Sequence, residues 1–439
     1  MVSRHIDGIF DIIIIGSGVS GLTCACILGK FGKKVLVLEQ HDRPGGCLHT
    51  FQEKGFTFQS GNHYIGHIDP VCKALIKTCG SSYTEKDDIV EQYIWNSERK
   101  QMRKNGWEDV MGAPEQNVIT MADHMWWIAL IKLAPRWLAI IAWWILNICF
   151  PQSFMSYGAW MQQQGYNKWW KMQEGDVGCP PIAMVGAAVA RHYMHGGTML
   201  SEKFVHECCR TIRRQGGRVV VNHAVQRIHN RGIVCNGSYV PCNTVISSIG
   251  AFQTCKIAHL PKLEKVCESI GQGVQHHFVF IGLSCTKETA NIPGVTWIKE
   301  EDDYMFVSAE ENRGKTSVHL VADEGNMSTE SMVALFIKHF PDATEHLAYT
   351  EDATPHSVQK YLGRHSSYGL QCSKDRFSTF EYVRTLRPET EMPHLYITGQ
   401  DILMPGIVSA MTAAMMTCRQ VLGFTLMDTI KQQDLMDKL

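Results

Sequence analysis

The sequence predicts an α/β protein of two domains, one of which is interrupted by the other. Residues 11–39 read as strand, glycine turn, helix and strand, which is a βαβ unit. Similar patterns recur near residues 201–248 and 394–422. The chain has 439 residues, more than one ordinary hydrophobic core accommodates. We therefore expect segments that are distant in the sequence to join into one domain, with a second, α+β domain inserted between them.

Short apolar runs and glycine turns define the expected elements. The expected strands at 11–15 and 35–38 contain the continuous apolar runs 12–15 and 35–38, typical of strands buried on both faces, and 19–31 has helical composition. Gly423 suits the left-handed residue that follows a helix. The later elements are expected as helices at 201–214 and 409–422 and strands at 219–221, 225–229, 244–248 and 394–398. We place the interrupted domain at 1–75, 195–255 and 376–439, and the inserted domain at 76–194 and 256–375.

The composition excludes several classes of protein. Hydrophobic residues make up 45% and charged residues 19%, as in globular proteins, and a net charge of -1 argues against a nucleic-acid partner. The 16 cysteines are scattered without any CxxC pair, so we expect no metal site and no disulfide framework. The scattered spacing is more typical of reduced, buried cysteine thiols in a cytosol-facing protein. The N-terminal residues lack the pattern of a secretory signal.

A glycine motif lies between the first apolar run and its helix. Residues 16–21 read Gly-Ser-Gly-Val-Ser-Gly, a GxGxxG in the context that gives this motif its mechanism. Gly16 allows the tight turn, Gly18 lets the backbone approach a pyrophosphate, and Gly21 lets the helix pack close to the strand. The helix start, with Ser20, presents N–H groups to the phosphates. These residues predict a dinucleotide site.

Three further features favour FAD over NAD as the occupant. Glu39 ends the second strand, where a carboxylate binds the hydroxyls of an adenosine ribose and repels a 2′-phosphate. Gly45 and Gly46 form a second glycine pair along which a long dinucleotide can pass. Gly399 and Asp401 follow a strand and precede a helix that starts near Val408, where an acidic residue can bind ribityl hydroxyls. The sequence therefore predicts a discontinuous, Rossmann-like FAD-binding domain, with NAD or NADP only as an external electron donor.

Four segments carry a specific resemblance: GSGVSGLTCACIL, LVLEQHDRPGGCLHTF, FQSGNHYIGH and LYITGQDILMPGIVSAMTAAM. In these segments the chain resembles the family of retinol saturases, phytoene desaturases and carotenoid isomerases. The resemblance runs from about residue 11 to 422 and is loose in the middle. It implies a tightly bound FAD, a membrane-derived apolar polyene or retinoid as substrate, and contact of Val225 with adenine.

The resemblance also indicates two candidate catalytic residues. His63 lies between Gly61 and Gly66, and Tyr368 lies in a segment before the C-terminal motif. Each has an equally good structural explanation: His63 would be a core histidine hydrogen-bonded to backbone, and Tyr368 would be an aromatic residue that only packs in a loop. One departure affects the substrate side: relatives carry a Pro-Arg-Gly-Gly-like turn before the helix at 201–214, and residues 193–201 are shorter and lack the Pro-Arg pair.

Residues 126–150 form a tryptophan-rich apolar segment. The unbroken apolar run is shorter than the roughly 20 residues of a spanning helix, and clustered tryptophan beside basic residues is typical of a helix at a membrane interface. A buried core helix is the alternative. We expect a peripheral or monotopic protein on the cytosolic face of a membrane such as the endoplasmic reticulum.

The expected function is reduction of a carbon–carbon double bond in a polyene, as in retinol saturation. Carotenoid desaturation or isomerisation would use the same fold and motifs. A flavin-dependent protein that binds lipids without catalysis is the alternative from another class, because of the shortened turn.

Overall fold

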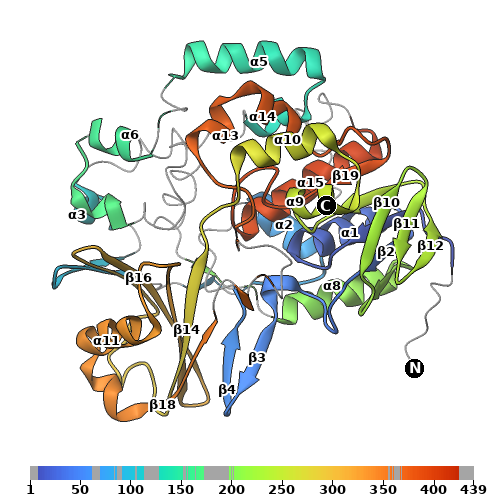
Figure 1. Ribbon diagram of the computed structural model, residues 1–439. Helices are drawn as coiled ribbons and strands as arrows, with labels where there is room; N and C mark the ends of the chain where they lie inside the picture. Colours follow the sequence, from blue (N-terminus) through green and yellow to red (C-terminus); the bar gives the residue numbers. More distant parts are fainter. Residues whose placement is uncertain are drawn as a thin grey trace.

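The computed structural model describes most of the chain. The described residues are 8–61, 70–83, 85–86, 91–103, 106–112, 128–151, 155, 157–163, 165–172, 197–198, 200, 202–353, 356–357, 359, 366 and 368–424. Two large sheets, each with its own helices, make up the molecule, and helix α5 lies at its periphery (Figure 1). The α/β class expected from the sequence is confirmed.

The first sheet is parallel and has five strands in the order β19-β13-β1-β2-β9. All four neighbouring pairs are parallel, and Ile14 of β1 is in register with Val37 of β2 and Ile246 of β13. Its strands come from three distant stretches of the chain, as predicted: β1 (Ile12–Ile15), β2 (Val35–Leu38), β9 (Arg218–Val220), β13 (Val245–Ser247) and β19 (Leu395–Ile397).

Both faces of this sheet are covered, which explains why β1 and β2 are continuous apolar runs. Alternate side chains of a strand point to opposite faces. Ile12 and Ile14 pack among helices α1 (Val19–Lys30), α2 (Pro70–Thr78), α8 (Glu202–Arg214) and α15 (Ile407–Leu422). Ile13 and Ile15 pack in the opposite core with α9 (Ala251–Ile257) and α10 (Pro261–Ile270). Gly423 is left-handed after α15, as predicted.

A small antiparallel sheet of three strands lies beside the parallel one (Figure 1). It consists of β10 (Val225–His229), β11 (Gly232–Cys235) and β12 (Ser238–Pro241). Ile228 and Ile233 contribute to the same core as Ile13 and Ile15. The small sheet therefore packs against one face of the parallel sheet.

The second large sheet has seven strands in the order β18-β14-β17-β16-β15-β6-β7. Only the β15–β6 pair is parallel. Helix α11 (Thr329–His339) packs on one face through Met332 and Phe336. The strands are β6 (Glu91–Trp95), β7 (Glu98–Met102), β14 (His276–Leu283), β15 (Val295–Glu300), β16 (Asp303–Asn312), β17 (Lys315–Asp323) and β18 (Leu347–Ala353).

Shorter elements connect the two sheets. The hairpin of β3 (Thr50–Glu53) and β4 (Phe56–Gln59) packs Phe56 and Phe58 against Phe280 of β14. The remaining elements are η1 (Gly46–Leu48), β5 (Glu85–Lys86), α3 (Trp107–Met111), α5 (Arg136–Cys149), α6 (Tyr157–Gln163), η3 (Lys168–Met172), β8 (Gly197–Thr198), η4 (Pro341–His346), α13 (Lys374–Ser378) and α14 (Phe380–Thr385).

Helix α5 occupies most of the tryptophan-rich segment 126–150. Residues 128–133 are also helical, and Pro135 precedes the first residue of α5. Trp126 and Trp127 lie outside the described residues. In the part of the chain that the structure describes, no helix has the length and apolar character to cross a membrane.

Candidate dinucleotide and substrate site

The first glycine turn needs glycine for two separate reasons. Gly16 has φ +91°, and a Cβ there would lie 2.7 Å from the Ser248 hydroxyl oxygen. A Cβ on Gly21 would lie 2.2 Å from the carbonyl oxygen of Gly16, closer than any real contact. Gly16 therefore supplies a positive φ, and Gly21 lets α1 approach the end of β1.

The start of α1 is open to a ligand. Gly18 is the N-cap residue, no side chain caps the helix, and a Cβ on Gly18 would meet nothing within 4 Å. The first N–H groups of a helix have no partner within it, and the helix dipole favours an anion there. Ser20 lies buried in this first turn. These features fit a pyrophosphate.

Glu39 lies next to the glycine turn, at the end of β2. Its Oε2 accepts hydrogen bonds from the Ser17 backbone N–H at 3.0 Å and the Ser17 hydroxyl at 2.6 Å. Its Oε1 accepts one from the His41 N–H at 3.0 Å. A carboxylate has about four acceptor sites, so one remains for a ribose hydroxyl, and a second contact requires the Ser17 hydroxyl to rotate away.

The second glycine pair packs directly on the first turn. The Gly45 N–H donates to the Ser17 carbonyl at 3.1 Å and lies 3.2 Å from its hydroxyl oxygen. A Cβ on Gly46 would lie 3.2 Å from the Cα of Gly18, and both Gly45 and Gly46 have positive φ. The structure thus brings these two predicted segments together.

The segment before Val225 runs alongside Glu39. The His223 N–H donates to the Glu39 carbonyl at 2.7 Å, and the Asn222 N–H donates to the His41 carbonyl at 2.8 Å. Val225, half-buried at the start of β10, follows this segment two residues after His223.

The C-terminal loop contributes a second uncapped helix start. A Cβ on Gly399, which has φ +104°, would lie 3.3 Å from the Ser20 hydroxyl, so this loop reaches the first turn of α1. Helix α15 begins after Gly406 without a side-chain cap, and Val408 is its second residue. The loop that leads to α15 thus lies against the first turn of α1, although the two are far apart in the sequence.

Asp401 is buried and braces two segments. Its Oδ2 accepts a hydrogen bond from the Ala251 N–H at 2.7 Å, and its Oδ1 accepts one from the Leu370 N–H at 2.9 Å. Each oxygen keeps one further acceptor site for the ribityl hydroxyls expected from the sequence.

Sequence reasoning missed Arg376, which holds the same loop. Its buried guanidinium donates to the carbonyl oxygens of Leu370 at 3.1 Å, Gln400 at 3.1 Å and Asp401 at 2.6 Å. No local sequence motif predicts the role of Arg376, because tertiary packing determines which carbonyl groups it contacts.

Tyr368 lies near this network. Gly369 follows it, and a Cβ there would lie 2.2 Å from Asp401 Oδ1. The Tyr368 ring packs edge-on against His276, with ring centroids 5.1 Å apart, and the His276 Nε2 lies 3.8 Å from an Asp323 oxygen. His276 is thus a second neighbour that the sequence did not indicate.

The other expected substrate-side features fall largely outside the described residues. His63 is among them, although Gly61 lies against Cys47, next to the second glycine pair. Of the shortened turn, Gly197 and Thr198 form β8, which pairs with β5. Residues 193–196, 199 and 201 of this turn lie outside the described residues.

Helix α5 exposes an apolar stripe. Trp137 and Trp144 are 68% and 58% exposed. The stripe also contains Ile140, Ile141, Ile145, Ile148 and Phe150. Trp143 does not belong to it, because its ring packs inward, 5.5 Å from that of Phe380.

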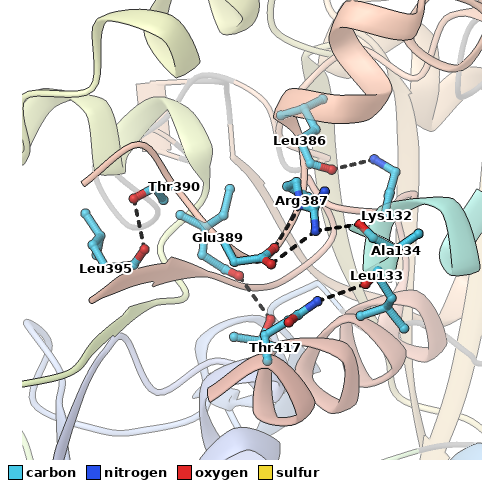
Figure 2. Close-up of polar contacts among 11 residues, drawn as sticks. Lys132, Leu133, Ala134, Leu386, Arg387, Glu389, Thr390, Leu395 and Thr417 are labelled. Atoms are coloured by element: carbon cyan, nitrogen blue, oxygen red, sulfur yellow. Dashed lines mark hydrogen bonds and ion pairs between the residues drawn. The ribbon is translucent and has the colours of Figure 1, made fainter. Parts of the chain in front are cut away.

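Buried polar contacts anchor the residues that lead into α5 (Figure 2). The Lys132 Nζ donates to the Leu386 carbonyl at 2.5 Å, and Arg387 donates to the Ala134 carbonyl at 3.2 Å while pairing with Glu389. Gln420 of α15 donates to the Leu133 carbonyl at 3.2 Å. Burial, with smaller contributions from nearby arginines, holds the pKa of Lys132 well below its usual range. The residues that lead into α5 are thus held by hydrogen bonds to Leu386, Arg387 and Gln420.

Comparison with known proteins tests the fold and the resemblance expected from the sequence. The family model "NAD(P)-binding Rossmann-like domain" matches residues 14–78. An all-trans-retinol 13,14-reductase of Danio rerio is 25% identical over 94% of this chain and 86% of its own. A protein named inactive all-trans-retinol 13,14-reductase, also of Danio rerio, is 22% identical over 98% and 89%. Prolycopene isomerase 1 of an Oncidium hybrid cultivar is 49% identical over 15% and 12%. The resemblance expected from the sequence is confirmed.

Solved structures share the fold. Wild-type putrescine oxidase bound to putrescine has a TM-score of 0.68 at 15% identity, covering 94% of this chain and 99% of its own. A fatty acid isomerase from P. acnes has a TM-score of 0.63 at 11% identity, covering 96% and 100%. These likenesses support the Rossmann-like fold with an inserted second domain.

Proposed function

We propose that this protein is an FAD-dependent oxidoreductase that reduces a carbon–carbon double bond of an apolar polyene, in the manner of all-trans-retinol 13,14-reductases. One observation carries the proposal: the uncapped start of α1 lies against the Gly45–Gly46 pair, next to Glu39 and within reach of the Gly399 loop that leads to α15. A chain similar to the reductases over 94% of its length builds that site. Bound FAD would supply the hydride chemistry.

We assign the cofactor contacts from one end of the site to the other. Val225 lies against adenine, and Glu39 binds the adenosine ribose. Gly16, Gly18, Ser20 and Gly21 bind the pyrophosphate through backbone N–H groups. Gly45 and Gly46 line its path, and Gly399, Asp401 and Val408 hold the ribityl and flavin end.

FAD fits this arrangement better than NAD. FAD has a ribityl chain between its pyrophosphate and its flavin, and in this proposal the residues from Gly399 to Val408 bind that part of the cofactor. A nicotinamide dinucleotide has no ribityl chain and would leave these residues without a ligand. The uncapped start of α15 and the spare acceptor capacity of Asp401 are suited to such a group.

The substrate end of the site would lie near Tyr368 and His63. Tyr368 is tied to the cofactor loop through Gly369, Leu370 and Asp401. In this role the protein binds and orients the polyene and excludes water, and His276 restricts the Tyr368 ring through their edge-on contact.

We further propose that the inserted domain comprises 76–194 and 256–375, and that α5 rests on a membrane surface. The exposed Trp137 and Trp144 suit the boundary between headgroups and acyl chains. Contact of this kind gives access to a substrate that water does not dissolve. The exposed stripe of α5 supports peripheral or monotopic attachment to a cytosol-facing membrane such as the endoplasmic reticulum.

Two alternatives lead to different outcomes. Desaturation or isomerisation of a carotenoid would use the same site. The 49% identity to a prolycopene isomerase over 15% of this chain supports that alternative. Binding without catalysis is favoured by the shortened turn before α8 and by the resemblance to a protein named inactive.

The flavin itself provides the test. The purified protein should be yellow and release FAD on denaturation. Under anaerobic conditions dithionite should bleach it, and all-trans-retinol should restore the oxidised spectrum. Release of FMN, or no flavin at all, would contradict the cofactor assignment. A bleached protein that no polyene reoxidises would favour the binding protein.

A further inference from the structure

Three cysteines that are far apart in the sequence meet behind the dinucleotide turn. Cys26 lies on α1, Cys79 directly follows α2, and Cys208 lies on α8. All three are buried, and their sulfur atoms lie within 4.8 Å of one another. The absence of CxxC spacing argued against a metal site, but spacing is uninformative when the ligands come from three separate helices.

The backbone around these cysteines is held in place. The Thr211 hydroxyl donates to the Cys79 carbonyl at 3.0 Å, and the Gln215 side chain donates to the Cys26 carbonyl at 3.2 Å. Both donors belong to α8 or its C-terminal turn, which also carries Cys208. Packing and hydrogen bonds therefore set the sulfur positions before any ligand arrives.

We propose that Cys26, Cys79 and Cys208 form a three-coordinate thiolate site for a soft metal ion, with copper(I) as the ion that fits best. The site is separate from the proposed catalytic function and does not depend on it.

Ligand type and number support copper(I). Soft thiolates select copper(I), zinc and iron–sulfur clusters, and structural zinc takes four ligands. Among the described residues, no fourth histidine, cysteine, aspartate or glutamate joins this group. A trigonal ion therefore fits better than a tetrahedral one.

The direct experiment is a copper(I) titration of the full-length, flavin-loaded and reduced protein against bicinchoninate under anaerobic conditions. A Cys149→Ser background removes the exposed thiol of α5. We expect one equivalent of copper(I) to leave the chelator, three sulfur neighbours by X-ray absorption, and a higher unfolding temperature. Cys208→Ser should weaken binding at least about a hundredfold, since even the loss of a group that only supports a ligand costs 10–100-fold.

Cys235→Ser is the matched control, because Cys235 is a buried cysteine of β11 outside the cluster. It should bind copper(I) like the parent. If Cys208→Ser does not fold, protection from alkylation in the parent replaces it: copper(I) should shield Cys26, Cys79 and Cys208 selectively. No uptake, equal affinity in Cys208→Ser and Cys235→Ser, or protection of other cysteines would overturn the proposal.

Discussion

Replacing Trp137 and Trp144 by serine should release the protein from membranes and leave the cofactor bound. These two rings are the most exposed aromatic side chains of α5, at 68% and 58%. Aromatic side chains present about 150–250 Å² each, so the pair exposes on the order of 250 Å². At about 25 cal/mol/Å², full transfer into lipid would contribute about 6 kcal/mol.

Only part of that free energy is available at an interface, because a helix in the headgroup region immerses one face. If half is realised, the double variant loses about 3 kcal/mol, which corresponds to about a hundredfold weaker partitioning. Trp143 should be left unchanged, since its ring packs on Phe380 and its removal would disturb the fold.

Sedimentation with phosphatidylcholine vesicles measures this partitioning directly, and flavin absorbance of the supernatant reports the cofactor. Tyr239→Ser is the matched control, because it removes a similarly exposed aromatic ring from β12. Equal sedimentation of the double variant and the control would refute the argument. A parent protein that ignores vesicles altogether would also refute it.

Three further changes test the site and its support. Gly18→Asp should fold, since a Cβ there meets nothing within 4 Å, but it should lose flavin because the new carboxylate repels the pyrophosphate. Gly294→Asp is the control, because a Cβ there is equally unobstructed, and it should keep its flavin. Unchanged flavin content in Gly18→Asp would contradict the pyrophosphate site at the start of α1. Asp401→Ala should lower the free energy of unfolding by about 2–5 kcal/mol in denaturant titrations, since it leaves two buried N–H groups without an acceptor; a loss below about 1 kcal/mol would argue against the brace. Burial lowers the pKa of Lys132 in the folded chain, whereas in the unfolded chain this pKa is near its ordinary 10.5. At a pH between the folded and unfolded pKa values, Lys132 is protonated in the unfolded chain and neutral in the folded chain. The free energy of unfolding should therefore rise with pH in that window, by up to about 1.4 kcal/mol per pH unit, in the parent but not in Lys132→Met, and parallel pH profiles would contradict it.

The sequence was most informative where the controlling interactions are local. Apolar runs of four residues beside a glycine turn predicted β1, β2 and α1 within a residue or two, because strand burial and helix entry are decided by near neighbours. Gly16 and Gly21 are similar cases, since a single turn determines their contacts.

The features that the sequence did not reveal depend on tertiary packing. Arg376 acts through carbonyls of a loop about 25 positions away, and the cysteine cluster joins three helices. On α5 the periodicity of Trp137, Ile141, Trp144 and Ile148 describes one stripe. Apolar residues surround the whole helix, however, so only packing shows that this stripe faces outward while Trp143 faces in.

The most direct test of the proposed function is the mass of the product. Reduced enzyme incubated with all-trans-retinol under anaerobic conditions should convert it to a species two mass units heavier, with absorbance shifted to the blue, as the oxidised flavin spectrum returns. An unchanged mass with altered retention would instead mean isomerisation, and a lighter product would mean desaturation. With full flavin occupancy, no product from any polyene would contradict the assignment of an enzyme.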